Sequence, residues 1–200
     1  MMRVNFKWFG LLCLFFLLTG CGYNEIQRLD EQVKAAWSQT LNQYERRADL
    51  VPKLVNSVDA YMTHEKEVLT QVTEARAQVG QIKISAADLD NPALMQRFAE
   101  AQNQLGSALA RLLAVAENYP QLKSDGLFLD LMTQLEGTEN RIATERGRYV
   151  QAVQAYNVFI RQFPNVITAK IFGYPVMENY GLDRESELMR DPEVRFGNTR

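Results

Sequence analysis

The sequence contains few of the side chains that most often bind metal ions or act as nucleophiles. Its 200 residues include one histidine and two cysteines. A zinc-protease motif would need a second histidine four residues after His64, where the sequence has Val68. A di-iron bundle would need two Glu-x-x-His pairs, which one histidine cannot supply. We therefore expect no catalytic residues, no metal site and no cofactor, and we expect that the protein is not an enzyme.

An excess of charge of one sign is also lacking. Lysine and arginine together number 22, aspartate and glutamate number 24, and the formal net charge is -2. Proteins that bind nucleic acid carry a basic surface for its phosphates, so we expect no nucleic-acid partner. The apolar share of 46% and the charged share of 23% are ordinary for a globular protein. The length fits one domain with a short appendage.

The N-terminus has the layout of a secretory signal. Arg3 and Lys7 precede an apolar run from Trp8 to Leu18. This run is shorter than the roughly 20 apolar residues that a helix needs to cross the hydrocarbon core of a bilayer. We therefore expect residues 1–20 to be a signal peptide.

The end of this run resembles the lipobox of bacterial lipoproteins, with the residues Leu18-Thr19-Gly20-Cys21. That resemblance implies a diacylglycerol on Cys21, with residues 21–23 as the lipidated anchor and acyl chains such as palmitate in the membrane. The alternative is an uncleaved N-terminal anchor with an unmodified Cys21. Both alternatives predict a membrane-anchored protein of the bacterial cell envelope. Because Gly22 is not aspartate, an enteric-type sorting system would direct it to the outer membrane.

Beyond Asn24, apolar residues recur at spacings of three and four, which is the period of an α-helix. No stretch alternates with period two for long enough to indicate a sheet. We predict an all-α protein, with an antiparallel four-helix up-and-down bundle over residues 24–164 and a C-terminal appendage and tail over residues 165–200. The signals for helix ends are Gly80, Asn91-Pro92, Pro120, Ser124 and Phe163-Pro164.

Pro52 allows two interpretations of the first half. The apolar stripes on its two sides stay in phase, which favours one long helix from residue 24 to residue 80, kinked at Pro52. A break near Ala48-Asp49 would instead give four helices of more similar length, with Asp49 as the N-cap and Pro52 where no helical donor is lost. We favour the second interpretation.

Several segments resemble the LemA family of bacterial envelope proteins. The matching segments cover nearly all of the chain after Cys21: Glu45–Val55, His64-Glu65, Asn118–Lys123, Gly137–Ala143, Tyr149, Tyr156-Asn157, Ile160–Pro164, Phe172–Tyr174 and Pro192–Phe196. The resemblance implies a four-helix bundle outside the cytoplasm, tethered at its N-terminus and without known catalytic activity. Members of this family generally carry an uncleaved transmembrane helix, and the lipobox departs from that pattern.

Because the sequence shows no recognisable set of catalytic residues, we expect an envelope scaffold or adaptor with a protein partner. The alternative is a membrane-organising protein that acts directly on lipid. The partner could also be a second copy of the chain, and the sequence does not name it.

A buried ionic layer is the main candidate among the charged residues of the bundle. Glu139 and Arg146 lie seven apart, on the same helical face as the apolar Ile142. Arg46, Arg47 and Asp49 could reach them from the first helix junction. Such a layer would fix the register of the helices more than it would stabilise them. The alternative is that these groups bind a ligand.

The appendage begins with an apolar segment, residues 166–177, which follows the last long helix. In an up-and-down bundle this segment lies at the end where the first helix begins, facing the membrane. We favour a cap across the bundle end. The alternative is a second membrane contact through Ile167, Ile171 and Phe172, with Lys170 toward phosphate. Residues 183–200 alternate in charge and read as a solvated tail.

Overall fold

The computed structural model describes the backbone of residues 6–180 and the side chains of residues 22–180. Over this range the chain is helical and has no strand, so the predicted all-α class is confirmed. The elements are α1 (Phe6–Asp59), α2 (Lys66–Gln81), a 3-10 helix η1 (Ala86–Asp88), α3 (Pro92–Ala116), α4 (Pro120–Lys123), α5 (Gly126–Arg161) and α6 (Asn165–Phe172). The predicted signal peptide, the side chain of Cys21 and the charged tail lie outside what the structure describes.

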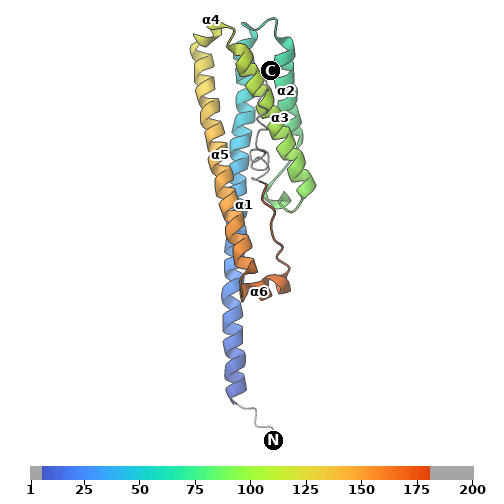
Figure 1. The fold of residues 1–200 in the computed structure, drawn as a ribbon, viewed down its shortest axis with the longest axis vertical. Helices are drawn as coiled ribbons and strands as arrows, with labels where there is room; N and C mark the ends of the chain where they lie inside the picture. Colours follow the sequence, from blue (N-terminus) through green and yellow to red (C-terminus); the bar gives the residue numbers. More distant parts are fainter. Residues whose placement is uncertain (1–5, 181–200) are drawn as a thin grey trace, which may run out of the picture.

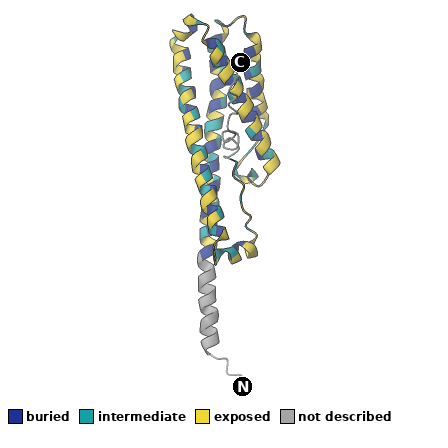
Figure 2. Cartoon of the chain, in the orientation of Figure 1, coloured by how far each residue is buried: buried dark blue, intermediate teal, exposed yellow. Residues whose placement is uncertain are grey.

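Four long helices lie side by side along one axis of the molecule (Figure 1). Helix α5 packs along α1, whereas α2 and α3 pack against each other beside the upper part of α1 in this view. Helix α6 contacts both α5 and α1 at the lower end. Figure 2 shows the buried residues as stripes along the inner faces of these helices, as the spacing of the apolar residues predicts.

The apolar core has two parts along the length of the molecule. The upper cluster is built on Leu50, Leu54 and Val58 of α1 together with α2, α3 and the first half of α5. The lower cluster is built on Ile26, Val33 and other residues of α1, packed against the second half of α5 and the start of α3. Both clusters therefore depend on α1, which passes through each of them.

Helix α1 does not break near Ala48-Asp49, so the favoured interpretation of Pro52 is wrong. The helix continues through Pro52 to Asp59, and α2 begins only at Lys66. The single helix from 24 to 80 is wrong as well, because residues 60–65 form a turn. Leu50, Val51 and Leu54 are buried on one side of α1, and this packing keeps the segment helical.

A side chain from α2 compensates for the donor that Pro52 lacks. Proline has no N–H, so the carbonyl of Ala48, four residues earlier, loses its helical partner. The Nε of Arg76 donates to this oxygen at 3.4 Å. The unpaired carbonyl thus connects α1 to α2, and the proline is tolerated inside the helix.

The turn after α1 is held by buried and hydrogen-bonded side chains. Met62 is fully buried in the upper cluster. The hydroxyl of Tyr61 donates to Asp125 Oδ2 at 3.0 Å, which ties the turn to the start of α5. Asp125 also accepts from the backbone N–H of Phe128 at 2.9 Å, and these two bonds hold the pKa of its carboxyl below the usual value.

The predicted N-terminus of α3 is confirmed, and the predicted N-cap of α5 is wrong. The Asn91 side chain accepts from the backbone N–H of Leu94, and Pro92 begins the helix. The N-cap of α5 is Asp125, and Ser124 instead ends the short α4. Asp125 is one residue closer to the helix and its carboxylate reaches the first-turn N–H group, so it satisfies that donor in place of Ser124.

Replacing Pro52 by alanine is expected to raise the free energy of unfolding by about 1–3 kcal/mol. Proline inside a helix costs about 3 kcal/mol relative to alanine, and the bond from Arg76 offsets part of this cost. Urea unfolding followed by circular dichroism measures the change. Arg76→Ala should cost less in the Pro52→Ala background than in the native chain, because Ala48 then has a helical donor. A Pro52→Ala variant that unfolds more easily than the native chain would contradict this account.

Candidate functional site

A buried arginine joins three helices at the middle of the molecule. Arg47 of α1 is 5% exposed. Its Nη1 donates to both carboxylate oxygens of Glu139 on α5, at 2.9 and 3.2 Å. Its Nη2 donates to the backbone oxygen and the side-chain Oε1 of Gln102 on α3, at 3.1 and 2.5 Å. One guanidinium therefore fixes the position of α1 relative to α3 and α5.

The surroundings of Arg47 are only partly polar. The ring of Tyr44 lies 5.3 Å from the guanidinium carbon, within the range of a cation–π contact. The side chain of Glu139 is 44% exposed, so this ion pair lies at the edge of the core with one partner in water. Two buried atoms, Nε of Arg47 and Nε2 of Gln102, have no hydrogen-bond partner among the described residues. The cluster thus retains unused donors next to a surface groove.

The structure pairs two of the five residues named for the ionic layer, and Arg46 is exposed. Arg47 and Glu139 form the ion pair. Asp49 is exposed and lies outside it, because two positions along a helix turn a side chain about 200° away. Arg146 is half-buried and lines a small cavity of about 100 Å³ together with Trp37 and Tyr149. It lies two turns from Glu139, about 10 Å along α5. Gln102, which accepts from Arg47, lines the same cavity.

Gln102 is the member of the cluster that the sequence analysis missed. It is buried, at 4% exposed, and it accepts the shortest bond from Arg47. The signal was present in the sequence, because position 102 lies four after Phe98 and three before Leu105 in an apolar stripe. A polar residue at a stripe position predicts a buried hydrogen-bonding partner.

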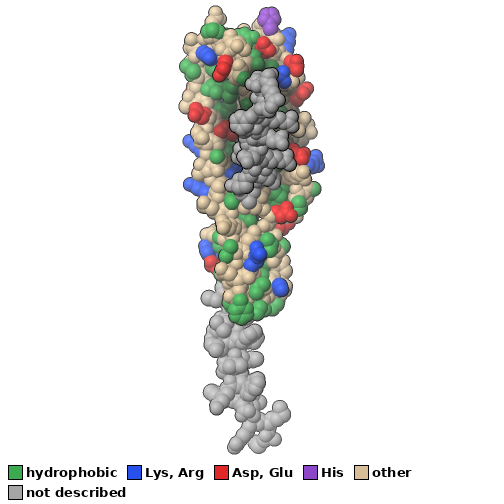
Figure 3. All heavy atoms as spheres, viewed as in Figure 1, with side chains coloured by type: hydrophobic (Ala, Val, Ile, Leu, Met, Phe, Trp, Pro, Cys, Tyr) green, Lys and Arg blue, Asp and Glu red, His purple; other side chains and the backbone are tan. Residues whose placement is uncertain are grey.

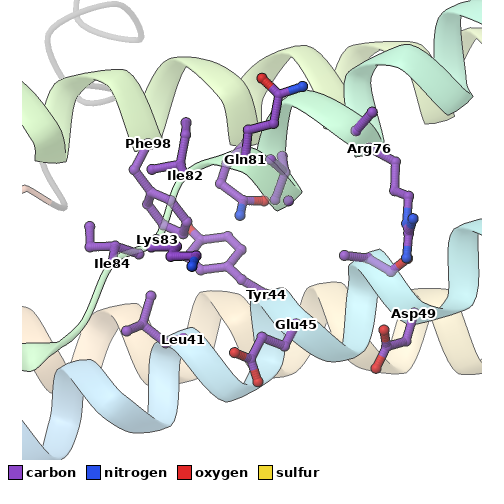
Figure 4. Close-up of a pocket in the computed structure, with 15 residues that line it drawn as sticks. Leu41, Tyr44, Glu45, Asp49, Arg76, Gln81, Ile82, Lys83, Ile84 and Phe98 are labelled. Carbon is purple, nitrogen blue, oxygen red and sulfur yellow. The ribbon is translucent and has the colours of Figure 1, made fainter.

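A groove of about 830 Å³ lies next to this cluster, between α1, the end of α2, the chain after it and α3 (Figure 4). Its apolar surface includes Leu41, Ile82 and Ile84, and the rings of Tyr44 and Phe98 meet edge to face with centroids 5.4 Å apart. Figure 4 shows these side chains converging between the ribbons.

Charges of both signs line the same groove. Glu45 and Asp49 lie one turn apart on the α1 wall, whereas Arg76 and Lys83 come from α2 and the chain after it (Figure 4). Aromatic rings with separated opposite charges suit a polar and apolar protein segment better than a small uncharged molecule. Chemically, the groove offers groups for recognition and no pairing of a nucleophile with a base along its lining.

The residues predicted for a membrane contact lie at the lower end of the molecule. Ile167, Ile171 and Phe172 of α6 are exposed, as is Lys170. The opposite side of α6, with Thr168 and Ala169, is buried. The helix therefore closes the bundle end with one face and presents apolar side chains with the other. Within the part of the chain that the structure describes, no helix has an apolar stretch long enough to cross a membrane.

Arg47→Ala is expected to lower the free energy of unfolding by about 3 kcal/mol, because it leaves buried partners without their donor. Glu139→Gln should cost less than half as much, since water can reach its exposed side chain. Chemical denaturation measures both. The matched control is Arg46→Ala, at the exposed neighbouring position, which should change stability by less than about 0.5 kcal/mol. Equal losses for the two arginine variants would contradict a structural role for Arg47.

Comparison with known proteins identifies the family of this chain. The LemA family model matches residues 36–196. Protein LemA of Metamycoplasma hominis is 27% identical over 186 residues, which cover 88% of this chain and 79% of that protein.

Magnetosome protein MamQ 2 of Paramagnetospirillum magneticum is 39% identical over 80 residues, and magnetosome protein MamQ of Magnetospirillum gryphiswaldense is 35% identical over 80 residues. These two matches cover 40% of this chain and 29% of each magnetosome protein. The family model covers most of the chain, and it confirms the resemblance seen in the sequence motifs. The chain belongs to the LemA family.

Proposed function

We propose that the protein is a noncatalytic scaffold or adaptor of the bacterial cell envelope. In this proposal it forms an antiparallel four-helix bundle on the extracytoplasmic side, and its N-terminus anchors it to a membrane, through a lipidated Cys21 or an uncleaved N-terminal segment. The observation that carries the proposal is the groove beside Arg47, whose aromatic floor and two charged walls match a protein segment in chemistry and size.

The rigidity of the groove supports a binding role. The two acidic residues of its α1 wall, Glu45 and Asp49, each lie two positions from Arg47, which is bonded to α3 and α5. Its α2 wall is held to α1 by the bond from Arg76 to the Ala48 carbonyl. A groove with fixed walls loses little conformational entropy when a partner binds, which favours affinity.

The names of the relatives fit a non-enzymatic role. Two of them are named as magnetosome proteins and one as protein LemA, and none of these names states a reaction. A component of a larger assembly needs a surface that binds a partner and a segment that attaches it to the membrane. In our proposal the groove binds the partner and the N-terminal segment attaches the protein to the membrane.

A second candidate function is direct organisation of the membrane. The exposed apolar side chains of α6 favour it, because they lie at the end of the bundle where α1 leads to the apolar N-terminal run. In this alternative the principal partner is lipid or a second copy of the chain.

The test is in-cell cross-linking of the full chain, followed by mass spectrometry of the proteins that are captured. A groove variant, Glu45→Lys with Asp49→Lys, reverses the charge of the α1 wall. The matched control is Glu136→Lys, an exposed carboxylate on α5 outside the groove. We expect one dominant partner that the groove variant loses and the control retains.

Two other results would contradict an adaptor that binds its partner through the groove. A partner captured equally by both variants would place the interface away from the groove. Capture of only further copies of the chain would favour the membrane-organising alternative.

A further inference from the structure

The lower end of the molecule carries an apolar patch that the core does not explain. Four large side chains around α6 are strongly exposed: Phe163 at 81%, Ile171 at 71%, Phe172 at 59% and Ile167 at 40%. We call these four residues the α6 patch. Figure 3 shows hydrophobic side chains gathered at the lower end of the described part of the chain. An exposed apolar cluster of this kind marks a surface that a membrane or a protein partner covers.

We infer that the α6 patch rests in the interfacial layer of the membrane to which the chain is anchored, and that it holds the bundle upright on that surface. This inference rests on the proposed membrane anchoring. It adds a second lipid contact, made by the folded domain itself.

The patch is displayed rigidly. Gly22 of α1 lies so close to α6 that a Cβ atom there would be 2.8 Å from Asn165 Oδ1. The ring of Phe172 packs against Tyr23 of α1, with centroids 4.9 Å apart. Helix α6 ends at Gly173, which adopts the left-handed conformation with φ of 74°. The helix is therefore fixed to α1 while its apolar face remains outside.

The chain that follows α6 adds to this rigidity. Asn157 of α5 donates to the backbone oxygen of Met177 at 2.8 Å and accepts from its N–H at 2.9 Å. The hydroxyl of Tyr156 donates to the oxygen of Pro175 at 3.2 Å. These bonds tie residues 175–177 back to α5, so α6 is held on both sides.

The identity of the covering surface follows from the continuity of α1. This helix begins at Phe6, so the apolar run that ends at Leu18 lies on the same helix as Gly22 and Tyr23. Gly22 lies four positions after Leu18, about 6 Å along the helix axis, and directly after Cys21. Interfacial helices insert about 5–10 Å into the boundary between headgroups and acyl chains. A membrane that receives either the apolar run or the acyl chains of a lipidated Cys21 therefore also meets the α6 patch.

The charges at this end agree with a lipid surface. Lys170 lies within α6 and Arg161 ends α5, and both side chains are exposed. Aromatic and aliphatic side chains flanked by lysine or arginine are the composition of interfacial membrane segments.

The experiment uses the full chain in liposomes of phosphatidylethanolamine and phosphatidylglycerol. In a Trp8→Phe background, the reporter is Phe172→Trp in the patch. The matched control is His64→Trp, exposed at the far end of the bundle (Figure 3). Trp37 is buried in the core and gives the same background in both proteins. Lipids brominated near the headgroup end of the acyl chain quench any tryptophan at the interface.

We expect the Phe172→Trp reporter to lose more than half of its added emission in brominated liposomes, and the His64→Trp control to lose none. If the chain floats with the liposomes but the two reporters are quenched equally little, the inference is overturned and the proposed anchoring stands. If the chain does not float at all, the proposed anchoring itself fails.

If the emission of the Phe172→Trp reporter shifts to the blue without quenching, and copies of the chain cross-link to one another, the inference is also overturned. The patch is then assigned to self-association.

A second pair of variants tests whether quenching depends on the apolar surface of the α6 patch. Ile171→Asp should abolish quenching of a Phe163→Trp reporter, whereas Lys66→Asp at the far end should leave it unchanged.

Discussion

We expect one charged side chain, Arg47, to hold the alignment of α1 with α3 and α5, the two helices to which it is bonded. On α1, the lower apolar cluster extends up to Tyr44 and the upper one starts at Leu50, so Arg47 lies in the layer between them. On α3, Gln102 lies near the same boundary, four residues after Phe98 of the lower cluster and next to Ala101, where the upper cluster begins. A sliding helix would bury the guanidinium without its acceptors, at a cost of several kcal/mol. We therefore expect the polar layer to favour one alignment of α1, α3 and α5 over the shifted alignments that the apolar stripes alone would allow.

The two halves of the bundle close their cores differently. Above the polar layer, α2 and α3 complete the core beside α1 and α5. Below it α2 is absent and α3 contributes only its start, so residues 174–180 cover the lower cluster, with Tyr174, Met177 and Tyr180 packed against it. Burial there raises the pKa of Tyr156 to about 12. Residues 174–180, which belong to the appendage predicted from the sequence, thus cover part of the core.

The limits of the sequence analysis have identifiable physical causes. Helical periodicity predicted the all-α class because each stripe is buried along its length. The end of α1 was missed because no glycine or proline marks residues 60–65; the turn forms through long-range contacts, namely the burial of Met62 and the bond from Tyr61 to Asp125. Pro52 was misjudged because its compensation comes from Arg76, 24 residues later on another helix. Arg47 was named from the sequence as able to reach Glu139, and the two form an ion pair. Gln102, the third member of the cluster, was missed because it lies on another helix, 55 residues after Arg47.

The continuity of α1 also constrains how the proposed adaptor could work. The same helix carries the N-terminal apolar run, the docking site of α6 and the acidic wall of the groove at Glu45 and Asp49. From Gly22 to Glu45 the helix rises about 35 Å. In the proposed orientation a partner must therefore reach the groove well above the headgroups, and a protein confined to the bilayer could not. Because no hinge interrupts α1 between these points, a tilt of the bundle at the membrane moves the groove sideways with it. The contact that fixes this tilt thus also decides which partners the groove can meet.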